Sequence, residues 1–221
     1  MTLISKSAPI DIDVLVINWH ITDKCNYRCK YCFSSWQADE TGGEVWRSEE
    51  KTKRLLEELW LAFDPDNVSN PLRSKLRWRS VRLSLAGGEA TLLQERLIDI
   101  TQHAKKLGFS VSLITNGSLL TEPYLTALIP GLSMLGLSVD STAPQTNAAI
   151  GRSNRRGPPL TTQNFADITK WARTVNPGLT IKLNTVVNKV NAHENMSGLL
   201  NAVEAARWQV MRVLPDRQSV V

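Results

Sequence analysis

A repeated order of strand, loop and helix constrains the fold of this chain more than any other feature of its sequence. Short apolar, β-branched runs predict buried strands, and each is followed by polar or glycine residues and then by an amphipathic helical pattern. Parallel neighbouring strands need long connections, which helices usually supply. The sequence therefore predicts an α/β fold with a parallel sheet and right-handed crossovers. The expected strands are 14–20, 81–85, 109–114, 133–139, 179–187 and 208–214.

Helices are expected in the intervening segments. The patterns predict helices over 46–63, 91–107 and 192–205, a helix opened by Thr121 and Pro123, and a helix around Phe165. A chain of 221 residues with 42% hydrophobic content can bury one substantial core, so we expect a single domain over residues 1–221.

The segment 64–80 combines turn residues with a basic run around Trp78, and we expect it to be a surface insertion loop. An aromatic side chain among cations can bind nucleic acid, but a solvated charged loop is the commoner case, so nucleic acid is not expected as a partner. The net charge of +5 also suits a membrane surface or an anionic small substrate. No apolar run approaches the roughly 18 residues of a membrane span, so we expect a cytoplasmic protein that binds no membrane.

Polar side chains follow several predicted strands at the point where each strand ends. In parallel sheets, ligands gather at the carboxyl ends of the strands. We therefore expect one active site built from the three cysteines, Gly87-Gly88-Glu89, Asn116, Ser138 with Asp140, and Asn184.

All three cysteines lie within eight residues, as Cys25, Cys29 and Cys32 in the spacing C-x3-C-x2-C. A closed structural zinc site normally has four ligands, whereas an iron–sulfur cluster held by three thiolates keeps one iron open to an outside ligand. Two alternatives remain open at this point. The thiols could bind zinc with His20 as the fourth ligand, or they could be buried and inert.

The cysteine motif, with Tyr31 before its last cysteine, resembles the signature of the radical S-adenosylmethionine (radical SAM) enzymes. That family commonly forms a partial barrel of six βα units, so the resemblance implies a partial (βα)6 TIM-type barrel. Further matches occur in the same order as in the viperin-like branch of the family. They are Asn18-Trp19-His20-Ile21-Thr22, Asn116-Gly117-Ser118-Leu119, Asp140-Ser141, Ile150-Gly151-Arg152, Lys182-Leu183-Asn184 and Arg207-Trp208.

The resemblance implies a [4Fe–4S] cluster and S-adenosyl-L-methionine as cofactors. A reduced cluster on the cysteines would split S-adenosylmethionine, and the resulting 5′-deoxyadenosyl radical would take the C4′ hydrogen of a nucleoside triphosphate. Loss of water from C3′ and one more electron would then give the 3′-deoxy-3′,4′-didehydro nucleotide, a chain terminator for antiviral defence. The expected partners are CTP, UTP or GTP and an electron donor of the flavodoxin or ferredoxin type.

The resemblance also assigns roles to individual residues. It places the cluster, and hence catalysis, on Cys25, Cys29 and Cys32. It places S-adenosylmethionine on Tyr31, Gly87, Gly88, Glu89, Asn116, Ser138, Arg152 and Val186. It places the nucleotide on Asn18, Arg82, Lys182, Asn184 and Arg207. Guanidinium groups suit a carboxylate, and clustered cations suit a triphosphate.

The sequence departs from the viperin pattern at several positions. Ala86 replaces serine, Ala90 replaces proline, and Gln209 stands where viperins carry a lysine near the triphosphate. Viperins continue well past the sixth strand, whereas this sequence stops at Val221, so their C-terminal extension is expected to be absent. Two alternative functions follow: another radical SAM reaction such as peptide modification or enzyme activation, and a catalytically impaired iron–sulfur protein.

Overall fold

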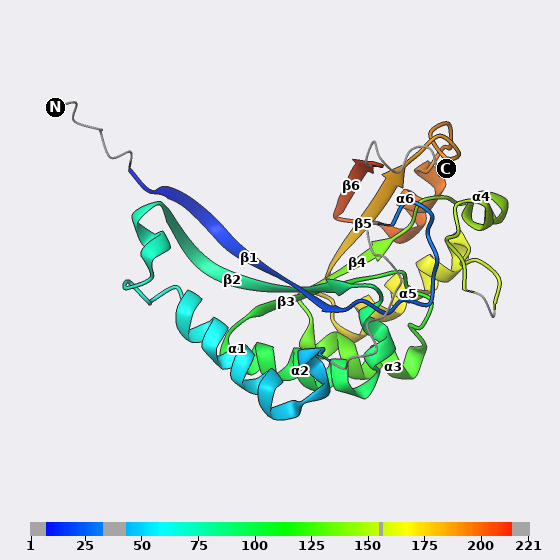
Figure 1. Ribbon diagram of the computed structural model, residues 1–221. Helices are drawn as coiled ribbons and strands as arrows, with labels where there is room; N and C mark the ends of the chain where they lie inside the picture. Colours follow the sequence, from blue (N-terminus) through cyan, green and yellow to red (C-terminus); the bar gives the residue numbers. More distant parts are fainter. Residues whose placement is uncertain (1–7, 33–42, 155–156, 214–221) are drawn as a thin grey trace.

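Six parallel strands form one sheet in which each strand pairs with the next along the chain. The computed structural model describes residues 8–32, 43–154 and 157–213. Figure 1 shows the sheet curving from β1 to β6 and remaining open between these two edges. The predicted α/β partial barrel is therefore confirmed as a six-stranded half-barrel. The strands are β1 Ile10–Thr22, β2 Leu76–Gly87, β3 Ser110–Thr115, β4 Met134–Ser138, β5 Thr180–Val187 and β6 Arg207–Arg212.

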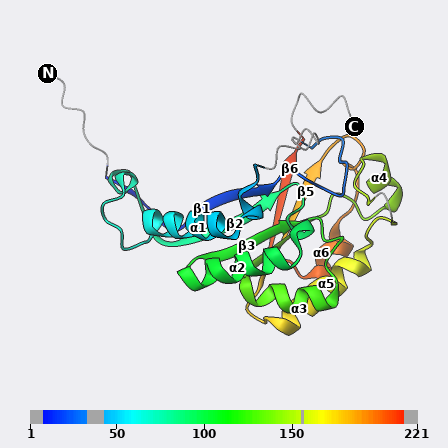
Figure 2. The same ribbon diagram turned by 60° about the horizontal axis from the view of Figure 1, so that its bottom comes forward.

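The helices cover one face of this sheet and leave its concave face to the functional side chains. Figure 2 shows α2, α3 and α5 side by side on the covered face. The helices are α1 Glu49–Phe63, α2 Glu95–Leu107, α3 Glu122–Leu128, α4 Pro144–Ala149, α5 Thr162–Val175 and α6 Ser197–Val203. Among the described residues, none of these helices has the length and apolar character needed to cross a membrane.

Local sequence signals define several helix ends. The Ser48 side chain accepts a hydrogen bond from the Lys51 amide at the start of α1. Thr161 and Asn164 form a reciprocal capping box at the start of α5. Gly108 ends α2 with a left-handed backbone, φ 118°, a conformation that glycine adopts without steric cost. These signals fix where each helix starts or stops relative to the strand beside it.

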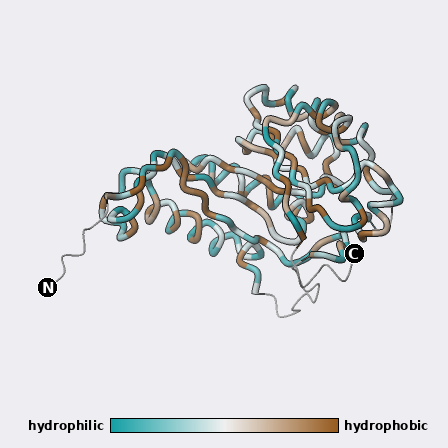
Figure 3. The backbone as a smooth tube through the Cα atoms, turned by 90° about the horizontal axis from the view of Figure 1, so that it is seen from above, coloured by the Kyte–Doolittle hydropathy of each residue, from teal (hydrophilic) through white to brown (hydrophobic). Residues whose placement is uncertain are grey.

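The core lies between the sheet and the helices. Alternate strand residues such as Leu83, Leu85, Leu113, Leu135 and Leu137 are fully buried against helix residues. Figure 3 shows hydrophobic stretches along the strands and more hydrophilic stretches in the loops. The opposite set of alternate strand residues therefore faces the concave side, where polar side chains are tolerated.

The expected insertion loop over 64–80 is wrong in its second half. Leu76–Ser80 belongs to β2, which runs beside β1 from Ile10 onward but pairs with β3 only from Arg82. The two strands thus form an arm beyond the rest of the sheet (Figure 1). Trp78 is 3% exposed and donates its indole N–H to the Phe63 carbonyl at 2.8 Å, so it is a core residue of this arm.

Three smaller corrections concern the helices and the last strand. The helix expected over 91–107 is a 3-10 turn, Ala90–Leu93, followed by α2, and the helix expected over 192–205 is only α6. The short helix α4 was not predicted, because its six residues carry no clear periodicity. The predicted sixth strand is confirmed as β6, while its expected end at Leu214 lies outside the described residues.

Candidate active site

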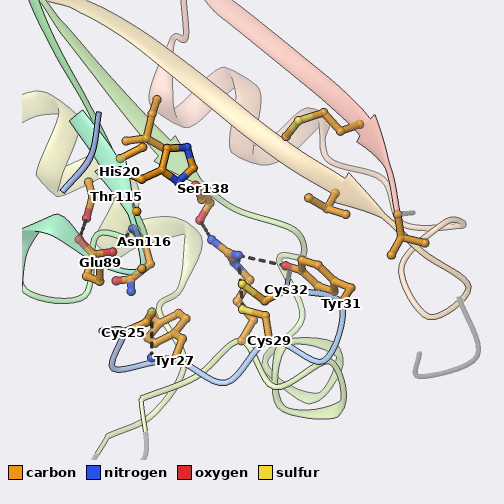
Figure 4. A pocket seen from close by; sticks show the side chains of 18 of the residues that line it. His20, Cys25, Tyr27, Cys29, Tyr31, Cys32, Glu89, Thr115, Asn116 and Ser138 are labelled. Atoms are coloured by element: carbon orange, nitrogen blue, oxygen red, sulfur yellow. Dashed lines mark hydrogen bonds between the residues drawn. The ribbon is translucent and has the colours of Figure 1, made fainter. Parts of the chain in front are cut away.

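A cavity of about 430 Å³ lies at the carboxyl ends of the strands, where the loop that follows β1 crosses them. We call residues 23–32 the cysteine loop. The cavity lining includes the three cysteines, His20, and every residue predicted to bind a cofactor. Figure 4 shows these side chains arranged around the cavity from several different strands and loops. The structure thus brings together the predicted cofactor residues Tyr31, Gly87, Gly88, Glu89, Asn116, Ser138, Arg152 and Val186.

The glycine pair after β2 lets the strand end approach the start of the cysteine loop. The Gly88 amide donates to the Thr22 carbonyl at 2.6 Å, and the Glu89 amide donates to the Lys24 carbonyl at 2.8 Å. A Cβ on Gly88 would collide with the Lys24 backbone, and Gly87 has a φ of 136°. Glycine is therefore required here for a close approach between two backbones.

The carboxylate of Glu89 is buried and forms hydrogen bonds only within the chain. It is 1% exposed and accepts from both the amide and the hydroxyl of Thr91, from the Thr115 hydroxyl at 2.6 Å, and from the Asn116 amide at 2.7 Å. The Asn116 side chain donates in turn to the Asn26 side chain at 2.8 Å. These bonds connect the ends of β2 and β3 to the cysteine loop.

The segment after α4 supports the middle of the cysteine loop. The Arg28 amide donates to the Gly151 carbonyl at 3.2 Å, and the Lys30 amide donates to the Ile150 carbonyl at 3.0 Å. Gly151 has a φ of 74°, and a Cβ there would collide with the Arg28 carbonyl. The backbone of Ile150 and Gly151 therefore sets the position of the residues between Cys25 and Cys32.

Asp140 joins the end of β4 to the end of the cysteine loop. It is 2% exposed, accepts a hydrogen bond from the Val186 amide at 2.7 Å and another from the Tyr31 hydroxyl, and pairs with Arg152 at 3.1 Å. Burial raises the pKa of the Asp140 carboxyl, and the Arg152 guanidinium opposes that rise. Sequence reasoning noted Asp140 as polar but gave it no role, although its place after a strand is a signal for one.

Arg152 lies between this carboxylate and the cysteines. Besides Asp140, it donates to the Tyr31 hydroxyl at 3.0 Å and to the Ser138 carbonyl, and it lies 3.8 Å from the Cys29 sulfur. Dashed lines in Figure 4 that end at Tyr31 and Ser138 mark these two hydrogen bonds. Its positive charge is thus held beside a predicted cluster ligand by neighbours that are themselves fixed.

The three thiols of the cysteine loop line one cavity and are the predicted cluster ligands. Burial raises the pKa of Cys25 to about 11 and also raises the pKa of Cys29, so a metal must displace protons to bind them. Among the described residues, no three His, Cys, Asp or Glu side chains are grouped closely enough for a metal ion.

The predicted nucleotide residues lie on the concave face next to the cavity. In β5, Lys182 and Asn184 share a face with Val186, which lines the cavity. Lys182 pairs in register with Arg207 of β6. Burial lowers the pKa of Lys182, and the positive charges of Arg207 and Arg82 lower it further. Asn18 precedes His20 by two residues and shares its face of β1.

Gln209 contacts this group of cations directly. It lies beside Asn184 in the register of β5 and β6, and its side-chain oxygen accepts a hydrogen bond from the Lys182 ammonium. Gln209 therefore belongs to the same surface as the predicted nucleotide residues, although the sequence marked it only as a departure.

Comparison with known proteins identifies what this arrangement is similar to. A family model described as the radical SAM superfamily matches residues 19–196. A Pseudoalteromonas ulvae protein named S-adenosylmethionine-dependent nucleotide dehydratase is 39% identical over 204 residues, which are 92% of this chain and 65% of that protein. A Fibrobacter protein of the same name is 35% identical over 206 residues, which are 93% and 57% of the two chains. The chain thus spans less than two thirds of these relatives' lengths.

Solved structures show the same fold at lower sequence identity. The structure of anSMEcpe with bound AdoMet has a TM-score of 0.63 and 19% identity, and the match covers 92% of this chain and 50% of that one. Streptococcus suis SuiB bound to S-adenosylmethionine has a TM-score of 0.56 and 16% identity, with coverages of 94% and 40%. These similarities support the half-barrel fold.

Proposed function

The chain belongs to the radical SAM superfamily, and from this premise we propose that it dehydrates a nucleoside triphosphate to the 3′-deoxy-3′,4′-didehydro form. One observation carries the proposal. The cavity that contains the three cysteines lies on the same face of the sheet as the cations Arg82, Lys182 and Arg207, and Lys182 pairs in register with Arg207. Such a site can hold a redox cofactor and a polyanionic substrate next to each other.

The residues around the cavity fit the two proposed cofactors. Cys25, Cys29 and Cys32 would hold a [4Fe–4S] cluster and leave one iron for S-adenosylmethionine. When bound, this pair supplies the one-electron chemistry that removes a hydrogen atom from the substrate. The buried carboxylates of Glu89 and Asp140 hold Asn116, Tyr31 and Arg152 around that cavity, and Glu89, which lines it, would also contact S-adenosylmethionine.

The cations would bind the triphosphate. Several positive charges on one face of the sheet match a polyanion, because the phosphates would neutralise the repulsion among the cations. Asn18 and Asn184 add neutral hydrogen-bonding groups on the same face. We infer that the ribose would lie between the triphosphate and the cofactor, with its C4′ hydrogen accessible. We infer CTP, UTP or GTP as the substrate class.

The product explains a role in antiviral defence. A nucleotide without a 3′-hydroxyl blocks chain extension once a polymerase has incorporated it. The reaction also consumes one electron after hydrogen removal, and we infer a flavodoxin or ferredoxin as its source. We infer a cytoplasmic location, as expected from the sequence.

Anaerobic reconstitution tests the proposal. The protein is loaded with iron and sulfide, reduced with dithionite, and incubated with S-adenosylmethionine and each nucleoside triphosphate separately. We expect 5′-deoxyadenosine together with a nucleotide that is lighter by one water in mass spectrometry. Cleavage of S-adenosylmethionine at the same rate with every nucleotide and with none, without that product, would favour a different radical SAM reaction. Absence of any 5′-deoxyadenosine would favour a protein that only binds.

A further inference from the structure

His20 is a cavity residue to which the family resemblance assigned no role. It lies near the carboxyl end of β1 and pairs in register with Ala86, which also lines the cavity. Figure 4 shows its imidazole on the opposite side of the cavity from Cys25, Cys29 and Cys32. Asn18, two residues earlier, is on the same face of β1. His20 thus lies between the cysteines and the proposed nucleotide surface, which consists of Asn18, Arg82, Lys182, Asn184 and Arg207.

The proposed reaction needs a proton donor at this place. This inference rests on the proposed function, in which the ribose loses its 3′-hydroxyl after hydrogen is removed from C4′. Hydroxide is a poor leaving group, and protonation in the transition state by a positioned side chain converts it into water. The donor must face the ribose rather than the triphosphate.

Other ionisable groups that line the described cavity are poorly suited to this task. The Glu89 carboxylate accepts several hydrogen bonds from within the chain, and the Tyr31 hydroxyl donates to Asp140. Burial raises the pKa of Tyr27, which makes it a weaker acid. The thiols are the proposed cluster ligands. The His20 imidazole, in contrast, carries ring nitrogens that can donate a hydrogen to a bound ribose oxygen.

We propose that His20 is the general acid that protonates the departing 3′-hydroxyl. The C3′–O bond breaks, its electron pair stays on oxygen, and the imidazolium proton transfers to that oxygen, so that water leaves and the imidazole becomes neutral. The positive charge passes to the substrate as a radical cation. One electron from the flavodoxin or ferredoxin donor then completes the C3′=C4′ double bond.

A nucleoside triphosphate deuterated at C4′ separates hydrogen removal from loss of water. The experiment compares wild type, His20→Gln and the control His193→Gln, whose exposed histidine lies outside the cavity lining. Deuterium in 5′-deoxyadenosine counts hydrogen removal, and the lighter nucleotide counts dehydration. We expect His20→Gln to keep deuterium transfer within about threefold while product per transfer falls by at least tenfold, since general acids contribute about 10²–10⁴ in rate.

Two results would overturn the role of His20. One is an unchanged ratio of product to deuterium transfer in His20→Gln. The other is loss of bound iron in both His20→Gln and His20→Asn, which would make the residue structural. The wild-type arm tests the proposed function separately, because its failure would show as no lighter nucleotide with any triphosphate.

Discussion

The two halves of the concave face are built in different ways. Around the cysteine loop, buried side chains such as Glu89 and Asp140, 1% and 2% exposed, form hydrogen bonds with neighbours from the same chain. On the proposed nucleotide side, Lys182 pairs in register with Arg207 of the exposed strand β6, and the charges of Arg207 and Arg82 lower the pKa of Lys182. The proposed cofactor half is therefore ordered by the chain itself, whereas the proposed substrate half contains like charges that a polyanionic ligand would neutralise.

Removal of a cysteine should have the largest effect of the substitutions tested, and it should abolish cluster binding in the cofactor half. Cys29→Ala deletes one of three thiols, and two thiolates are too few to hold the cluster, so we expect nearly all bound iron to be lost. Iron per chain and the brown colour of the anaerobically reconstituted protein measure this. Ser74→Ala, which removes a small polar group from an exposed position, is the control. Iron content equal to that of the control would disprove cluster binding by the loop.

Asp140→Asn should come next, because it leaves Arg152 buried without its charge partner. Removing one partner of a buried ion pair costs about 3–5 kcal/mol of unfolding free energy. The matched control is Asp13→Asn, since the Asp13–Arg79 pair has side chains 86% and 85% exposed and should contribute less than about 1 kcal/mol. Urea unfolding of the iron-free proteins measures both. Equal losses in the two variants would mean that the cysteine loop is not held by Asp140.

Gly151→Ala tests the backbone contact between Gly151 and Arg28 in the cofactor half. The substitution forces a positive φ on alanine and directs a methyl group at the Arg28 carbonyl, with a cost on the order of 1–3 kcal/mol. Gly198→Ala is the control, because nothing lies within 4 Å of a Cβ there and φ is not positive. We expect lower iron loading and a lower melting temperature in the first variant alone. A wild-type melting temperature and iron content for Gly151→Ala would contradict this account.

The sequence predicted the parts of the site that depend on local spacing. The cysteines, Gly87-Gly88 and Asn116 follow strands, and the hydrophobic pattern located every strand, so their meeting at one edge followed from parallel topology. It did not predict which groups bind one another. The pairing of Asp140 with Arg152 spans 12 residues and that with Tyr31 spans 109, and such contacts leave no periodic signal.

The arm of β1 and β2 shows that prediction from sequence has the same limit for the fold as for the site. The segment 73–79 has a basic residue at every second position, and this charge pattern indicated a solvated loop. In the structure those apolar residues face α1, with Trp78 buried against Phe63, while Arg77 and Arg79 are exposed. Pattern alone could not distinguish a charged loop from a strand with one buried face.

Lys182→Gln should have the smallest effect on stability. Unlike the preceding variants, it should stabilise the protein. Since the pKa of Lys182 is lowered in the folded protein, its charged form disfavours folding at neutral pH, and the cost disappears above the ordinary lysine pKa of about 10.4. We expect Lys182→Gln to stabilise the nucleotide-free protein at pH 7 by less than about 1 kcal/mol, because the side chain is partly exposed to solvent.

That gain should shrink as the pH rises, and the same variant should bind nucleoside triphosphate more weakly. Lys51→Gln, on the exposed face of α1, should change neither quantity. Melting temperatures from pH 7 to pH 11, with and without triphosphate, measure both effects. Two results would contradict binding of a polyanion by these cations. One is a lower stability of Lys182→Gln than of wild type at pH 7, and the other is a triphosphate affinity of Lys182→Gln equal to that of Lys51→Gln. In that case, the substrate half would be ordered by the chain in the same way as the cofactor half.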